Sequence, residues 1–175
     1  MRISAGKALA ALALALTSGL AAAGSAHAST ENWSQDDKKY LNNFQWYEAG
    51  FTSTMSYDDF WGNSLNFTDF HSWARSEGLA WKSVTLTDTW QADGIGLSSC
   101  SVSQKEGASC SGGGTQITAT RESSAPGATD IDHRISSIGL GGALITWGGE
   151  WSTAKFVIGA NLYEANASAS DGWTS

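Results

Sequence analysis

The sequence predicts a mainly β protein: an antiparallel β-sandwich or partly open barrel, with short helices from the N-terminal half packed against it. From residue 82 onward, hydrophobic and polar residues alternate with a period of two, which is typical of strands with one buried and one solvent face. Glycine-rich turn sequences separate these runs at short intervals. Upstream of residue 82 the pattern differs, because apolar and aromatic residues recur there at helical spacing.

The first 28 residues have the pattern of a secretory signal peptide. Arg2 and Lys7 precede an apolar run rich in Ala and Leu, which ends in Ala26-His27-Ala28. Thr17-Ser18-Gly19 interrupts the run, which is shorter than the ~20 apolar residues that a membrane span needs. We therefore predict a secreted, extracellular protein with a single globular domain from 29 to 175. Its expected parts are an aromatic-rich, partly helical segment (29–81), a β-rich segment (82–164) and a loose tail (165–175).

The charge of the chain limits its partners. The full sequence carries a net charge of -7, and loss of the leader would leave 8 basic residues against 17 acidic ones, a charge of -9. Such an acidic protein is repelled by nucleic acid and by anionic membranes. We expect an extracellular protein partner, with a glycan as the alternative, and no membrane span in the mature chain.

Three segments of the N-terminal half are predicted to be helical. Ser34 followed by acidic residues resembles an N-cap, which favours a helix from Gln35 to Glu48. A shorter turn is expected from Ser56, and another helix from Thr68 to a stop at Gly78. In the first helix the apolar residues at helical spacing are Tyr40, Leu41, Phe44 and Tyr47.

The strands begin with the run from Lys82 to Trp90, in which Val84, Leu86 and Asp88 alternate with serine and threonine. The segment AKFVIGANLYEA (154–165) is apolar on both faces, which favours a central strand. Further strands are expected at 94–103, 115–122, 131–138, 143–147 and 153–164, with turns at 112–114, 125–127, 141–142 and 148–149.

The two cysteines, Cys100 and Cys110, are predicted to form a disulfide. An even count at short spacing in an exported protein indicates a structural bridge rather than a metal site or a nucleophile.

Candidate catalytic residues are few, because only His71 and His133 remain after the leader, and neither lies in a known nucleophile, metal or phosphate motif. Asp130 and Asp132 lie two apart beside His133, which makes them weak candidates for a calcium or general-base site. A turn capped by two acids that pair with Arg134 is the favoured interpretation. The sequence predicts no enzyme activity, no metal and no cofactor.

The aromatic residues have two interpretations. Between Ser56 and Trp81 rings and carboxylates alternate as in a glycan site, but the three-residue spacing of Phe67, Phe70 and Trp73 favours core packing. The tryptophans with the most polar or glycine-rich neighbours are the candidates for an exposed binding surface. They are Trp33, Trp46, Trp61, Trp147 and Trp151, of which the last two are expected to flank a hairpin turn at Gly148-Gly149.

Three classes of function follow from this pattern. The favoured class is a non-catalytic protein-binding module, such as an adaptor, an inhibitor or a structural subunit of an extracellular bacterial assembly. A coplanar row of indoles on one sheet face would instead indicate a glycan-binding module. A histidine in a cleft beside a serine or a carboxylate pair would indicate a small secreted hydrolase.

Overall fold

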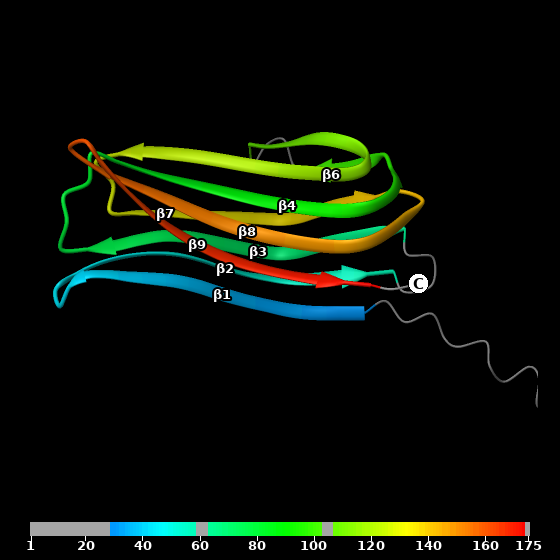
Figure 1. Cartoon of the computed structure of the whole chain (residues 1–175), viewed down its shortest axis with the longest axis horizontal. Coiled ribbons are helices and arrows are strands. Elements are labelled where there is room, and N and C mark those ends of the chain that lie inside the picture. Colours follow the sequence, from blue (N-terminus) through cyan, green and yellow to red (C-terminus); the bar gives the residue numbers. More distant parts are fainter. Residues whose placement is uncertain (1–28, 59–62, 103–106, 174–175) are drawn as a thin grey trace, which may run out of the picture.

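The computed structural model describes residues 29–58, 63–102 and 107–173, and it is an antiparallel β-sandwich (Figure 1). Two sheets lie face to face, and the side chains between them form the core. The prediction of a mainly β fold is therefore confirmed.

The first sheet has five strands in the order β1-β2-β3-β7-β5. Every neighbouring pair is antiparallel. Its strands are β1 (Ser29–Asn42), β2 (Gln45–Tyr57), β3 (Ser64–Glu77), β7 (Asp130–Gly141) and the short β5 (Ser99–Val102).

The second sheet has four strands in the order β6-β4-β8-β9, all of them antiparallel to their neighbours. The chain crosses from one sheet to the other after each of β3, β4, β5, β6 and β7. The strands of the two sheets therefore alternate along this part of the chain. The four strands are β4 (Ser83–Leu97), β6 (Ala108–Pro126), β8 (Leu144–Ile158) and β9 (Asn161–Gly172).

The helices predicted for 35–48 and 68–78 are wrong: the described residues from 29 to 77 form three strands instead. Ser56, where a shorter helical turn was expected to begin, belongs to the second of these strands, and residues 59–62 of that turn lie outside the described residues. From Phe51 to the end of β2 the buried residues alternate, with Phe51, Ser53 and Met55 facing inward. On β3, Phe67 and Phe70 both face inward despite their odd spacing, because Asp69 between them adopts a positive φ of 52° and shifts the strand by one residue. A bulge therefore produced the spacing of three that resembled a helix.

Four expectations for the C-terminal half also differ from the structure. Gly148-Gly149 lies inside β8 rather than in a turn, and the segment 154–165 is a hairpin that turns at Gly159-Ala160 rather than one central strand. Gly112 to Gly114 lie within β6 rather than in a turn. Residues 165–172 continue β9 and are not a loose tail. Glycine can occupy a strand where a side chain must pass over it, so a glycine pair alone did not mark a turn.

The core consists of two hydrophobic clusters separated by polar side chains. The larger cluster has Trp90, Phe70 and Ile138 among its members, and the smaller one has Phe156, Trp81 and Leu86. On β4, Asp88 lies between Leu86 of one cluster and Trp90 of the other. We call the six buried polar residues the polar belt: Ser53, Ser72, Asp88, His133, Glu150 and Ser152.

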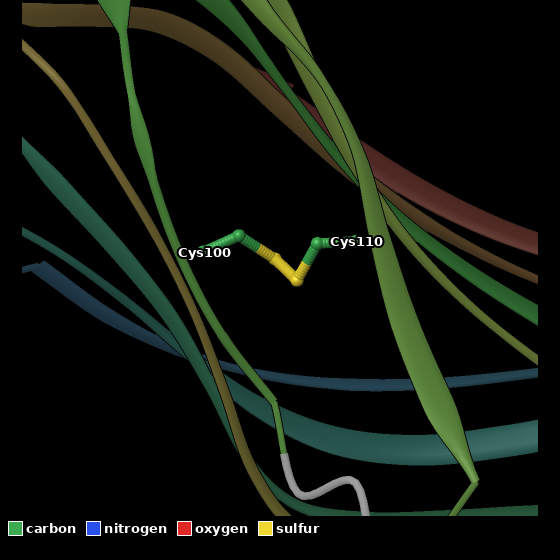
Figure 2. Close-up of a disulfide and its surroundings, with 2 residues drawn as sticks. All are labelled: Cys100 and Cys110. Atoms are coloured by element: carbon green, nitrogen blue, oxygen red, sulfur yellow. A yellow bond between two sulfur atoms is a disulfide. The ribbon is translucent and has the colours of Figure 1, made fainter.

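The two long sides of the sandwich are closed in different ways. On one side the Cys100–Cys110 disulfide joins β5 to β6, the edge strands of opposite sheets (Figure 2). This confirms the predicted bridge. On the other side Asp37 of β1 accepts a hydrogen bond from the backbone N–H of Asn166 in β9, at 2.8 Å. The Lys39 ammonium of β1 donates to the carbonyl of Glu164, also at 2.8 Å.

Candidate functional site

The strongest candidate for a binding surface is the outer face of the four-stranded sheet, where Trp147 and Trp151 lie. Both side chains belong to β8, and both are half-buried although they face away from the core. The ring centroids are 5.7 Å apart and the planes are tilted by 36°. We call this surface the tryptophan face.

Gly149 explains why the two indoles lie so close to the sheet. A Cβ at this position would come within 2.7 Å of the Trp147 ring and 3.1 Å of the Trp151 ring. Both rings therefore lean over the bare backbone of Gly149 and form one raised apolar knob. Of the two glycines that resembled a turn, Gly149 lies beneath the two rings, whereas Gly148 faces Leu65 and Trp173 on the other side of the sheet.

The surroundings of Trp151 are polar but uncharged. In register beside Trp151 lie Thr89 on β4 and Ser168 on β9, and beside Gly149 lie Gln91 and Ser170. On β6 the same two rows continue with Thr120 and Thr118. Asp93 lies in register beside Trp147, and the charged residues Glu122, Lys155 and Glu164 lie further along the face.

The remaining predicted tryptophans do not belong to this surface. Trp33 on β1 packs against the larger core cluster, with its ring 6.0 Å from that of Phe67. Trp46 lies half-buried on β2, in the other sheet. Its indole N–H donates to Glu77 at 2.7 Å, and the Lys38 ammonium lies 3.5 Å from its ring centroid. Trp61 lies outside the described residues. The five candidates therefore do not form a single site.

The polar belt holds the best-connected cluster of titratable groups in the described structure. The Asp88 carboxylate accepts hydrogen bonds from Ser72 at 2.9 Å and from Ser152 at 2.7 Å. Nδ1 of His133 lies 2.6 Å from the same carboxylate. Both Asp88 and His133 are almost fully buried. Because Ser72 binds the carboxylate and not the imidazole, this cluster lacks the serine-to-histidine contact that a hydrolytic triad requires.

Glu150 is the second carboxyl group of the polar belt. It forms a hydrogen bond with the Ser53 hydroxyl across the two sheets. Burial raises the pKa of Glu150 to about 8, and the nearby Asp88 charge acts in the same direction, while the Ser53 bond partly opposes the shift. Glu150 is therefore protonated in the folded protein at neutral pH.

His71 is the only other described histidine, and it lies on the outer face of the five-stranded sheet. Its Nε2 contacts Asp132 at 2.6 Å, and Asp132 also lies 3.6 Å from Arg134. Partial burial acts to raise the pKa of Asp132, but the bond to His71 and the neighbouring positive charges outweigh it and lower the pKa. Beside His71 is an open cavity of about 340 Å³, lined by Asp69, Phe70, His71, Arg134, Ile135 and Ser136.

The weak metal candidates, Asp130 and Asp132, are not brought together with further ligands. No group of three or more His, Cys, Asp or Glu side chains that could hold a metal ion occurs in the described parts of the chain. Asp132 pairs with His71 and Arg134, which partly matches the expected ion pairing of this segment.

Sequence reasoning did not find the polar belt, although one signal for it was present. Asp88 alternates in phase with Val84, Leu86 and Trp90, so an acidic residue shared a strand face with residues that belong in a core. A carboxylate on a buried face needs partners. Its three partners lie 16, 45 and 64 residues away, on β3, β7 and β8, and no local pattern connects them.

Comparisons with known proteins return no relative. No protein-family description matches the chain, and neither the curated proteins nor the solved structures contain a match. Within the described residues no helix has the length and apolar character needed to cross a membrane.

Proposed function

We propose that this chain is a secreted, non-catalytic binding module that contacts an extracellular protein partner through the tryptophan face. The observation that carries this proposal is the pair of half-buried indoles, Trp147 and Trp151, which lie over Gly149 on the outer face of the four-stranded sheet. Tryptophan is enriched among the residues that dominate protein interfaces. The Cys100–Cys110 disulfide fits an extracellular protein.

The distribution of charge on this face supports the same proposal. Hydroxyl and amide side chains such as Thr89, Gln91 and Ser168 surround Trp151 and Gly149. Asp93 is the charged residue beside Trp147, and the Gln91 amide donates a hydrogen bond to it at 2.9 Å. Protein interfaces have this arrangement, with few charges at the centre and a polar rim that excludes water from the anchor residues.

A glycan is the second candidate, because the hydroxyl and amide groups around Trp151 could hydrogen-bond an uncharged sugar. The ring geometry favours a protein over a long glycan chain. The two rings are tilted by 36° and converge over Gly149, so they form one knob rather than a coplanar row of platforms.

The test is to recover the tagged mature chain from the culture medium of the producing cell and to identify by mass spectrometry any protein bound in stoichiometric amount. Replacement of both Trp147 and Trp151 by Ala should remove that protein without unfolding the chain. The matched control is Trp46→Ala, which removes a half-buried indole from the opposite sheet and should leave the partner bound.

Two results would contradict the proposal. A wild-type chain recovered without any companion would remove the evidence for a protein partner. Retardation of the wild type, but not of the double variant, on a neutral polysaccharide gel would assign the tryptophan face to a glycan instead.

A further inference from the structure

A second surface, at one end of the sandwich, is independent of the tryptophan face. The turns β1–β2, β3–β4, β6–β7 and β8–β9 all lie at this end, on the left in Figure 1. Hydrogen bonds join them: Gln45 donates to the carbonyl of Gly78, and Ser76 donates to the carbonyl of Thr129. The backbone N–H of Gly127 donates to the carbonyl of Lys82. The ring centroids of Trp81 and Tyr163, 5.9 Å apart, add the β8–β9 turn. The four turns therefore form one continuous surface.

Four stretches of this surface contain no charged residue, although 15% of the chain is charged, and the exposed Lys82 borders them at the end of the β3–β4 turn. We call these four stretches together the uncharged end. It comprises residues 40–45 (YLNNFQ), 78–81 (GLAW), 126–129 (PGAT) and 159–163 (GANLY).

Large apolar side chains project from the uncharged end into solvent. Phe44 is 83% exposed, Tyr40 is 66% exposed and Leu162 is 58% exposed, with Leu41 at 40%. Four of the five large exposed hydrophobic residues in the described chain lie here, and the fifth, Ile95, lies near the opposite end of β4. Such clustering on a soluble surface marks a site of interaction.

Phe44 is held outward by an ordered turn. Asn42 accepts a hydrogen bond from the backbone N–H of Phe44 at 2.9 Å, and its amide donates to the Gln45 side chain at 2.6 Å. Gln45 in turn binds the carbonyl of Gly78 at 2.9 Å. These hydrogen bonds fix the turn in the conformation that exposes Phe44.

Leu162 lies on the same patch as the β1–β2 turn. The contacts of Asp37 with Asn166 and of Lys39 with Glu164 align β1 and β9 in opposite directions. Continuing this alignment by two residues places Leu41 beside Leu162. The patch thus extends across both sheets at the uncharged end.

Directly behind the patch lie the groups that suit a membrane interface. The Lys38 ammonium lies 3.5 Å from the ring centroid of Trp46 and 5.8 Å from that of Tyr40, so a cation lies beside two amphipathic rings. Tyr, Trp and Lys occupy this depth at lipid interfaces, with Phe and Leu further in. Charges of both signs occur within two residues of the four turns: Lys38, Lys39, Lys82, Glu77, Asp130 and Glu164.

We propose that the uncharged end docks on a zwitterionic lipid bilayer, with Phe44, Leu41 and Leu162 entering the interface. Projecting turns suit a deformable lipid surface, whereas a protein partner would have to supply a matching hollow. The equal number of basic and acidic residues behind the turns suits headgroups that carry both charges. An anionic bilayer would repel the acidic chain.

The experiment uses the mature chain and sucrose-loaded vesicles of phosphatidylcholine, with the bound fraction measured by sedimentation. The wild type should bind reversibly. Replacement of both Phe44 and Leu162 by Ser should lower the partition coefficient at least tenfold, because both side chains leave water only in the bound state. Ile95→Ser is the matched control, since Ile95 is 63% exposed but near the opposite end, and it should change binding less than twofold.

A gain-of-signal variant guards against misfolding of the double variant. Phe44→Trp should show a blue-shifted emission on phosphatidylcholine vesicles, and lipids brominated on the acyl chain should quench the added signal. Replacement of both Trp147 and Trp151 by Ala should leave vesicle binding unchanged, which separates this proposal from the proposed function.

Several results would overturn the proposal. They are no binding of the wild type to phosphatidylcholine, equal binding of the wild type and the double serine variant, or binding only to anionic vesicles with loss in high salt. A wild-type dimer in sedimentation velocity that Phe44→Ser converts to a monomer would assign the patch to a second copy of the chain instead.

Discussion

The two ends of the sandwich differ in how they are stabilised and in what they expose. The end opposite to the uncharged end contains the larger hydrophobic cluster and the Cys100–Cys110 bridge. The uncharged end lies over the smaller cluster. The long side opposite to the disulfide is closed by polar contacts such as that of Asp37 with Asn166. In the described chain the clusters have 17 and 9 buried residues, so apolar burial is concentrated away from the exposed apolar patch. The comparison suggests that stability and surface interaction are assigned to different ends.

The polar belt lies between the two ends, and the largest expected effect is its response to pH. Because the folded-state pKa of Glu150, about 8, lies above its ordinary value of 4.5, the folded protein holds one more proton than the unfolded chain between these values. The contribution of Glu150 to the free energy of unfolding is fully present below pH 4.5 and is lost as the pH rises through 8. The total loss is on the order of 4 to 5 kcal/mol.

Urea denaturation at pH 5, 7 and 9 measures this loss. Glu150→Gln should be more stable than the wild type at pH 9 and should show a flatter pH profile, since the amide can still accept a bond from Ser53. Glu122→Gln, on the outer face of β6, is the control and should follow the wild type. Identical profiles for the wild type and Glu150→Gln would show that Glu150 does not titrate in this way.

Removal of the central carboxylate of the belt should have the next largest effect. Asp88→Ala leaves the buried polar groups of His133, Ser72 and Ser152 without their acceptor, so we expect the free energy of unfolding to fall by about 3 to 5 kcal/mol. Thr87→Ala, whose side chain lies on the opposite face of β4, should lower it by less than about 1 kcal/mol. A loss below 1 kcal/mol for Asp88→Ala would mean that the belt does not join the two ends.

Removal of the disulfide measures how much the covalent link between β5 and β6 stabilises the side of the sandwich next to the larger cluster. The double change Cys100→Ser and Cys110→Ser should lower the free energy of unfolding by about 2 to 3 kcal/mol, because the unfolded chain regains the entropy of a short loop. Reduction of the wild type should lower its melting temperature by the same amount as the double variant. An unchanged melting temperature would show that the bridge does not contribute to the difference in stability between the two ends.

The smallest effect is expected on the side closed by polar contacts. Asp37→Ala removes the acceptor of the Asn166 N–H and the ion pair with Lys39, at a loss of about 0.5 to 1 kcal/mol, since both groups are partly exposed and water can replace the carboxylate. Thermal unfolding at low salt is the sensitive measurement. A loss as large as that of the double serine variant would mean that the two sides are closed equally strongly.

Part of this architecture could be predicted from local sequence, and part could not. The alternation of Val84, Leu86 and Trp90 indicated a strand, and β4 contains them. The tyrosines and Phe44 near residue 40 have helical spacing by coincidence. Tyr40 near the end of β1 and Phe44 in the following turn project into solvent, and only Tyr47 enters the core. A pattern rule assumes that apolar residues face the core, and it fails where the protein exposes them.

The sequence by itself determined the β class, through the period of two downstream of residue 82, and the disulfide, through its two cysteines. Only the tertiary structure decided that the N-terminal half is β, that Trp147 and Trp151 share a face with Thr89 and Ser168, and that Asp88 meets His133. The physical reason is the distance along the sequence between the residues that interact. Alternation and cysteine count are properties of a short segment or of composition, whereas these contacts depend on pairing between distant strands, and the register of each pair decides which side chains meet.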